Sequence, residues 1–171
     1  MLGLRETMPS NKSVFVYWAI IGLLLLTVAG LVLKFLVLGK TETGSDGRVA
    51  IVLDPPERAF VLNEMRQFLA GIQVMLDAAE RNDPAGIAQA AHPLGMAAAQ
   101  NTPAGMAAKL PLEFKTLGFS VHGDFDRIAM DAESMKDVRL SMQQLSETMK
   151  KCVACHATYQ LALPAPARRV P

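Results

Sequence analysis

The sequence predicts an all-α fold, an antiparallel four-helix bundle preceded by one N-terminal transmembrane helix. Three observations support this prediction. Residues 14–33 form an uncharged apolar run, four later segments repeat apolar residues at the helical period, and patterns typical of strands are almost absent. The expected divisions are a tail (1–13), a transmembrane anchor (14–39), a linker (40–56), the helical bundle (57–163) and a second tail (164–171).

The N-terminal apolar run is long enough to cross a membrane. Residues 14–33 contain no charged side chain, and twenty residues at about 1.5 Å each match the roughly 30 Å of a bilayer core. The run is longer than the ~7–15 apolar residues of a cleaved signal peptide, and no A-x-A-like site follows it. Tyr17 and Trp18 suit one membrane interface, and Lys34 can extend its ammonium group to the other. We therefore expect an uncleaved anchor.

Four amphipathic segments follow, at about 57–80, 84–99, 110–132 and from Ser134 to Leu163. The second begins cleanly, because Asp83 is a suitable N-cap and a proline follows it, and Pro93 is a possible kink. Ser134 and Asp137 form a capping-box-like pair at the start of the last segment. A three-helix domain with an irregular second segment is the alternative. The apolar stripes of the first, third and last segments are Val61, Met65, Phe68, Ile72, Met75, Ala79; Leu110, Phe114, Leu117, Val121, Phe125, Ile128; and Met135, Val138, Met142, Leu145, Met149, Cys152, His156, Tyr159, Leu163.

Charge and motif content exclude several functional classes. The chain has 17 basic and 16 acidic residues, and the part after residue 39 has 14 and 15, because Arg5, Lys12, Lys34 and Glu6 precede it. That part carries no basic stripe, so a nucleic-acid partner is not expected. No acid/base pair, activated nucleophile or phosphate-binding loop indicates a substrate-converting enzyme.

The last segment contains Cys152-Val153-Ala154-Cys155-His156, a C-x-x-C-H motif formed by the only two cysteines. In c-type cytochromes the two thiols form thioethers with haem and the histidine binds its iron. Helical spacing places Cys152, Cys155 and His156 on one face within about one turn. A thioredoxin-like site would accompany a βαβ pattern, and a closed zinc site would need two more ligands. The sequence therefore predicts one covalent haem c.

Residues Cys152 to Tyr159, at the end of a four-helix pattern, resemble the cytochrome c′ family, or class II cytochromes c. Met65-Arg66-Gln67 adds to the likeness, and the resemblance covers about residues 57–163. The chain departs from the family in its anchor and in Gln160, where a basic residue is common. The resemblance implies haem binding that includes Tyr159. It also implies attachment outside the inner membrane, with residues 1–13 cytoplasmic and 40–171 periplasmic.

The first amphipathic segment contains a candidate for the second axial ligand of the iron. In antiparallel helices, Met65 and His156 would lie at similar heights, roughly 10–12 Å from the same end. Met65 is thus a candidate sixth ligand, and ordinary core packing is its alternative role. His122 is the rival ligand, whereas His92, before Pro93, is expected to be structural.

Three charged residues could serve the same site. Arg66 could reach a haem propionate, and Lys150 and Lys151 could surround an exposed haem edge. A solvated helix surface is the equal alternative for Arg66 and the favoured interpretation for Lys150 and Lys151. Two functions remain open. One is electron transfer with a redox protein or a membrane respiratory or photosynthetic complex. The other is gas binding or gas sensing at an open iron.

Overall fold

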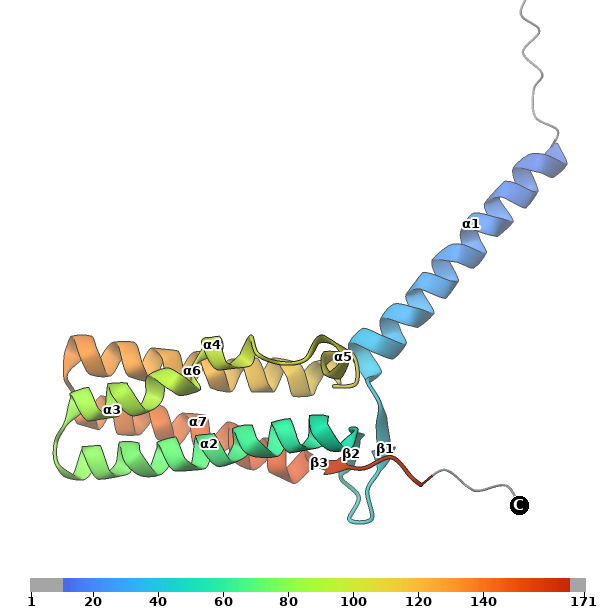
Figure 1. The fold of residues 1–171 in the computed structure, drawn as a ribbon. Coiled ribbons are helices and arrows are strands. Elements are labelled where there is room, and N and C mark those ends of the chain that lie inside the picture. Colours follow the sequence, from blue (N-terminus) through green and yellow to red (C-terminus); the bar gives the residue numbers. More distant parts are fainter. Residues whose placement is uncertain (1–10, 167–171) are drawn as a thin grey trace, which may run out of the picture.

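A computed structural model describes residues 11–166 and shows a mostly helical chain (Figure 1). An apolar helix, α1 (Asn11–Val32), continues as a π-helical segment, η1 (Leu33–Leu38). The stretch Val14–Leu38 is long and apolar enough to span a membrane, and none of it is buried against the rest of the chain. The expectation of one N-terminal apolar helix is thus confirmed. Most of the expected tail 1–13 and the last part of the expected tail 164–171 lie outside the described residues.

The domain that follows is built mainly from α2 (Pro55–Glu80), α3 (Pro84–Ala91), α6 (Leu112–Met135) and α7 (Val138–Thr158). The starts of α2 and α3 have local causes. Asp54 and Glu57 form a capping box at α2, with the Asp54 amide donating to Glu57 at 2.8 Å. The Asp83 carboxylate accepts from the Gly86 amide at 2.9 Å and caps α3. Helix α3 lies between α2 and α6, and α6 packs against α7.

The second amphipathic segment is broken rather than continuous. After α3, the chain forms a 3-10 turn, η2 (His92–Leu94), and two short helices, α4 (Met96–Ala99) and α5 (Ala104–Ala107). Pro93 lacks the amide that a continuing helix requires, and Gly95 is extended with ψ −171°. The structure thus confirms a mostly helical fold, but it does not show four long helices. The irregular second segment is closer to the alternative prediction.

The last helix differs from the prediction at both ends. Ser134 still belongs to α6, because the chain reverses only at Lys136, whose φ of 54° is left-handed. Asp137 then caps α7 by accepting from the Leu140 amide at 3.0 Å. At the other end α7 stops at Thr158, so the predicted helical stripe through Tyr159 and Leu163 is wrong. Residues Tyr159–Ala162 form a strand, β3, instead.

A small sheet occupies the stretch expected to be a linker. β1 (Thr41–Thr43) pairs antiparallel with β2 (Val49–Val52), and β2 pairs in parallel with β3, giving the order β1-β2-β3. The expected absence of strands in 40–56 is therefore wrong. The β-branched run around Val49–Val52 favours a strand, and Gly47 at φ 85° allows the tight turn before it.

Two apolar clusters form the core. The distal cluster joins α2, α3, α6 and α7 around the fully buried Met75, Ile87 and Phe125. The anchor-end cluster lies beneath the sheet and contains Ile51, Leu53, Val61, Met106, Leu110 and Tyr159. The predicted stripes of the first and third segments contribute to both clusters. Figure 1 shows that α1 joins the domain at the end where the sheet and the C-terminal end of α7 lie.

Candidate functional site

The two cysteines lie on the last two turns of α7. Cys152 and Cys155 are half-buried free thiols, and they are not joined in a disulfide. The Cys152 thiol approaches the Thr148 carbonyl at 3.6 Å, one turn earlier. Burial raises the pKa of both thiols, and the Asp124 carboxylate adds to this effect for Cys152. A raised pKa favours the neutral thiol over the thiolate.

His156 follows on the same side of α7 as Cys152. Its side chain is exposed, and within residues 11–166 its ring makes no hydrogen bond or ion pair. A ring without such a partner has both nitrogens available. The described residues bring together no group of three or more histidine, cysteine or carboxylate side chains that could hold a bare metal ion.

Met65 packs against the same apolar cluster as part of the motif. Met65 from α2 and Cys155 from α7 both pack, half-buried, against the anchor-end cluster. Two distant parts of the sequence are thus brought to one apolar region. Arg66, the next residue, is exposed and makes no hydrogen bond or ion pair within the described part of the chain.

Tyr159 is buried in the same cluster and forms its polar edge. Its ring packs edge-on against Phe114, with centroids 5.4 Å apart, and its hydroxyl donates to Glu113 at 3.3 Å. Burial, followed by the Glu113 carboxylate, raises the pKa of Tyr159. Sequence reasoning selected Tyr159 but missed both α6 partners, because helical periodicity does not show which helix faces the end of α7.

The rival ligand, His122, is already engaged. Its side chain is buried, its Nδ1 donates to the Leu94 carbonyl at 2.7 Å, and its Nε2 lies 3.4 Å from Glu64 Oε1. Its ring also lies against Phe68, at 5.0 Å between centroids. Burial by itself lowers the pKa of His122, but the Glu64 and Leu94 hydrogen bonds reverse this, and the net pKa is raised. Both ring nitrogens of His122 therefore have partners within the domain.

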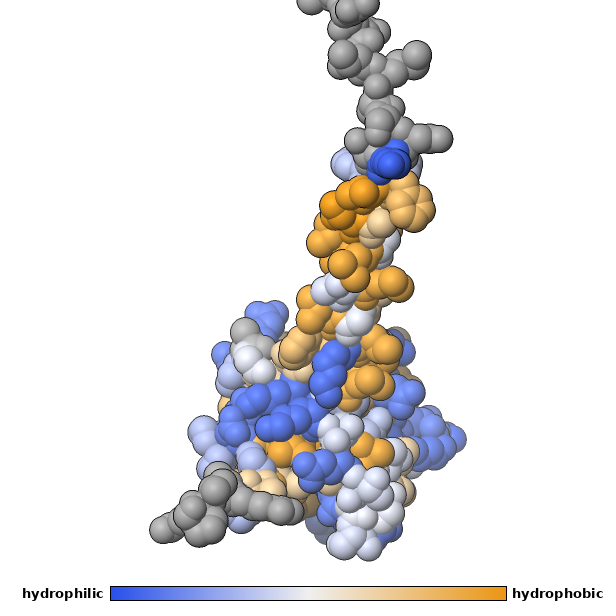
Figure 2. Space-filling model, turned by 90° about the vertical axis from the view of Figure 1, so that its right-hand side faces the viewer, coloured by the Kyte–Doolittle hydropathy of each residue, from blue (hydrophilic) through white to orange (hydrophobic). Residues whose placement is uncertain are grey.

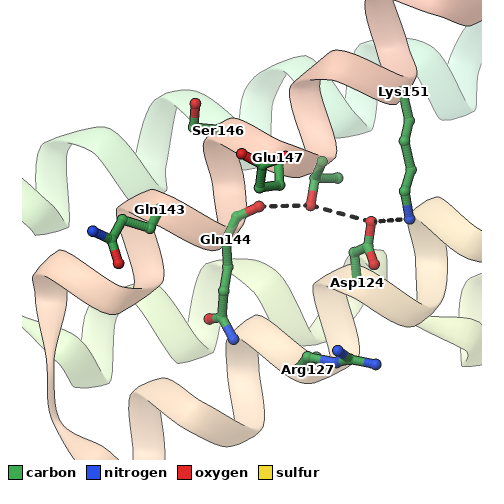
Figure 3. Close-up of a pocket in the computed structure, with 8 residues that line it drawn as sticks. Asp124, Arg127, Gln143, Gln144, Ser146, Glu147 and Lys151 are labelled. Atoms are coloured by element: carbon green, nitrogen blue, oxygen red, sulfur yellow. Dashed lines mark hydrogen bonds and ion pairs between the residues drawn. The ribbon is translucent and has the colours of Figure 1, made fainter.

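The lysines beside the motif are paired with carboxylates. Lys151 lies 2.5 Å from Asp124, which also accepts from Thr148 at 3.3 Å (Figure 3). Lys150 pairs with Glu147 at 2.6 Å on the surface. A polar hollow lies between α6 and α7, and its lining residues are Asp124, Arg127, Gln143, Gln144, Ser146, Glu147, Thr148 and Lys151. The two ion pairs leave little net positive charge around the motif, which favours the solvated-surface interpretation of Lys150 and Lys151.

Arg48 is the site residue that sequence reasoning missed. Its guanidinium donates to the backbone carbonyls of His156 at 3.0 Å and Tyr159 at 3.2 Å, at the C-terminal end of α7. Asp46 orients it through contacts at 2.7 Å. A cation at this end satisfies unpaired carbonyls and complements the helix dipole. The Asp46-Gly47 dipeptide was the available signal, because it is typical of a hairpin turn.

The chain was compared with models of protein families, with curated proteins and with solved structures, and none of the three comparisons found a match.

The residues of this site fit a covalently attached haem. Two unbonded thiols lie one turn apart, a histidine with no side-chain partner follows, and an apolar cluster containing Phe114 and Met65 adjoins them. Thiols can form thioethers, and imidazole is an iron ligand.

Proposed function

We propose that this protein is a membrane-anchored monohaem c-type cytochrome that transfers electrons on the periplasmic side of the inner membrane. The observation that carries the proposal is the arrangement of Cys152, Cys155 and His156, whose side chains are chemically free at the end of α7. Haem, when bound there, supplies one-electron redox chemistry. The resemblance to the cytochrome c′ family supports the same assignment, with α2, α3 to α4, α6 and α7 as the counterparts of its helical bundle.

Different residues of the chain would contribute different parts of haem binding. Cys152 and Cys155 would hold the group through thioethers, and His156 would bind its iron. Arg48 fixes the backbone of the turn that carries His156, because it binds the carbonyls of His156 and Tyr159. Such outer contacts set the orientation of a ligating histidine.

Met65 is the proposed sixth ligand. It packs against the same apolar cluster as Cys155, whereas both ring nitrogens of His122 are occupied. A thioether ligand would favour the reduced state and close the iron to small gases. This supports electron transfer over the gas-binding alternative.

The apolar N-terminal helix agrees with a membrane-anchored carrier. The stretch Val14–Leu38 is long enough to span a bilayer, and a tethered carrier reaches partners by diffusion in the membrane plane. We propose a redox protein or a larger respiratory or photosynthetic membrane complex as the partner.

The test is covalent haem attachment in the full chain, expressed with a c-type maturation system. Haem staining of denatured protein on a gel should be lost in the double variant Cys152→Ala/Cys155→Ala. Val153→Ala is the matched control, because this exposed residue lies between the cysteines without contributing a ligand, and it should stain like the unmutated chain. Equal staining of the double variant would refute the proposal.

A further inference from the structure

The anchor is docked onto the domain by specific contacts. Segment η1 remains exposed but lies beside α6, where the Lys115 ammonium donates to the Leu36 carbonyl at 3.0 Å. The Lys40 amide donates to the Lys109 carbonyl at 2.7 Å. Between them, Gly39 adopts φ 65°, and a Cβ atom there would lie 2.5 Å from the Lys109 carbonyl oxygen. Only glycine allows this approach, so the junction is a packed joint rather than a flexible linker.

The joint lies at the end of the domain that carries the C-x-x-C-H motif. β1 starts at Thr41, two strands away from β3, and neighbouring strands are about 4.8 Å apart, so β3 is about 10 Å from β1. β3 follows α7 directly, with the motif on the last turns of that helix. The turn between α6 and α7 lies at the opposite end, about 31 Å away along the 21 residues of α7 (Figure 1).

The surface around the joint is suited to lipid headgroups. Figure 2 looks onto this end of the domain and shows the apolar anchor rising from a largely hydrophilic face. Lys34 and Lys40 flank the last apolar residues of the span and are exposed. Within residues 11–166 neither forms a salt bridge with a carboxylate. Lysines at such positions place their ammonium groups among lipid phosphates.

We infer that the anchor acts as a rigid strut that holds the motif-bearing end of the domain against the lipid headgroups. The site is thereby presented to a partner embedded in the same membrane, and the end with the α6–α7 turn projects away from it. The claim about the partner rests on the proposed function, whereas the orientation rests on the joint alone.

Nitroxide accessibility in vesicles tests the orientation. The full chain is reconstituted in phosphatidylcholine and phosphatidylglycerol vesicles with a genetically encoded, cysteine-independent nitroxide at Ala157, beside the motif, or at Met135, at the far end. Both positions are exposed. Relaxation is then measured with and without a nickel-chelating headgroup lipid. The nickel lipid should increase the relaxation rate of the nitroxide at Ala157 several-fold more than that of the nitroxide at Met135. An equal increase at both positions, or a larger one at Met135, would overturn the inference.

An insertion variant tests whether the joint causes the orientation. About ten glycine and serine residues placed between Gly39 and Lys40 separate η1 from its contacts with the domain. The difference between the two labels should then shrink, and an unchanged difference would overturn the strut.

Measuring haem attachment and orientation on the unmutated chain separates the two proposals. Orientation without haem attachment in that chain would refute only the proposed function, and Cys152→Ala/Cys155→Ala should keep the orientation, because the joint does not involve the cysteines. A chain that does not float with the vesicles would overturn the strut, whatever its haem content.

Discussion

Replacing Arg48 with alanine should destabilise the end of α7 that carries His156. In the structure one nitrogen of the Arg48 guanidinium donates to two carbonyls, those of His156 and Tyr159, at 3.0 and 3.2 Å. Alanine leaves these acceptors to water and removes a cation from the helix C-terminus. The hairpin that carries Arg48 then keeps its strand pairing with β3, the Gln160–Asp46 hydrogen bond and the packing of Ile51.

The magnitude follows from the geometry of the contact. A hydrogen bond from a charged donor contributes about 1.5–3 kcal/mol when it is well buried. The Arg48 side chain is 34% exposed, and its ion pair with Asp46 is lost with it. Solvent screening reduces such contributions, so we expect a loss of about 1–2 kcal/mol. At about 4 °C per kcal/mol for a domain of this size, the melting temperature should fall by about 4–8 °C.

Thermal melting of the full chain in detergent, followed by circular dichroism, measures this change. The melting temperature of Arg48→Lys should fall between those of the unmutated chain and Arg48→Ala, because lysine keeps the charge but not the planar guanidinium. Arg139→Ala is the matched control. This arginine lies on the first turn of α7, is exposed and makes no side-chain hydrogen bond or salt bridge among the described residues, so its effect should stay within about 0.5 kcal/mol. If Arg48→Ala and Arg139→Ala have the same melting temperature, Arg48 does not stabilise the end of α7.

Three further predictions concern the core and the site. The pKa of His122 is raised in the folded state, so protonated His122 stabilises the fold. This contribution is complete below about pH 6.5 and should be lost as pH rises through the folded pKa. In urea titrations at several pH values, Glu64→Gln should flatten this part of the curve of stability against pH. Phe125→Ala should cost about 3–5 kcal/mol in the same titration, whereas Phe119→Ala, on a half-exposed ring, should cost under ~1 kcal/mol; similar losses would show that the distal cluster is misassigned. Met65→Ala should give a high-spin haem spectrum and rapid carbon monoxide binding; an unmutated chain that is already high-spin would favour gas binding instead.

Helical periodicity predicted the long helices well because their apolar faces are buried against one another. The first segment was placed within a few residues of α2, and its stripe from Val61 to Met75 packs into the two clusters. Two residues expected to widen that stripe, Leu69 and Leu76, are instead 70% and 51% exposed. Periodicity identifies a helix, but the width of its buried face depends on which partners are present.

The sheet escaped prediction because its stability depends on contacts distant in sequence. β2 acquires its parallel partner only when the end of α7 arrives beside it, more than 100 residues later. Tyr159 fits a helical stripe and a buried strand position equally well, so spacing alone cannot decide between them. Arg48 was missed for the same reason, because its acceptors are backbone carbonyls that no side-chain pattern reveals.

In the candidate site, too, the residues that are neighbours in sequence could be predicted, and those that meet through tertiary contacts could not. Cys152, Cys155 and His156 are local in sequence, so the motif could be found without a structure. The proposed choice of Met65 over His122 depends on tertiary contacts, because only the structure shows that both nitrogens of His122 have partners.

The most direct test of the central claim is the intact mass of the unmutated protein after denaturation and removal of free haem, combined with its pyridine haemochrome spectrum. The account predicts a chain heavier than its sequence by one haem, with a spectrum typical of haem bound through two thioethers. A mass equal to that of the polypeptide alone, obtained from cells with an active c-type maturation system, would contradict it.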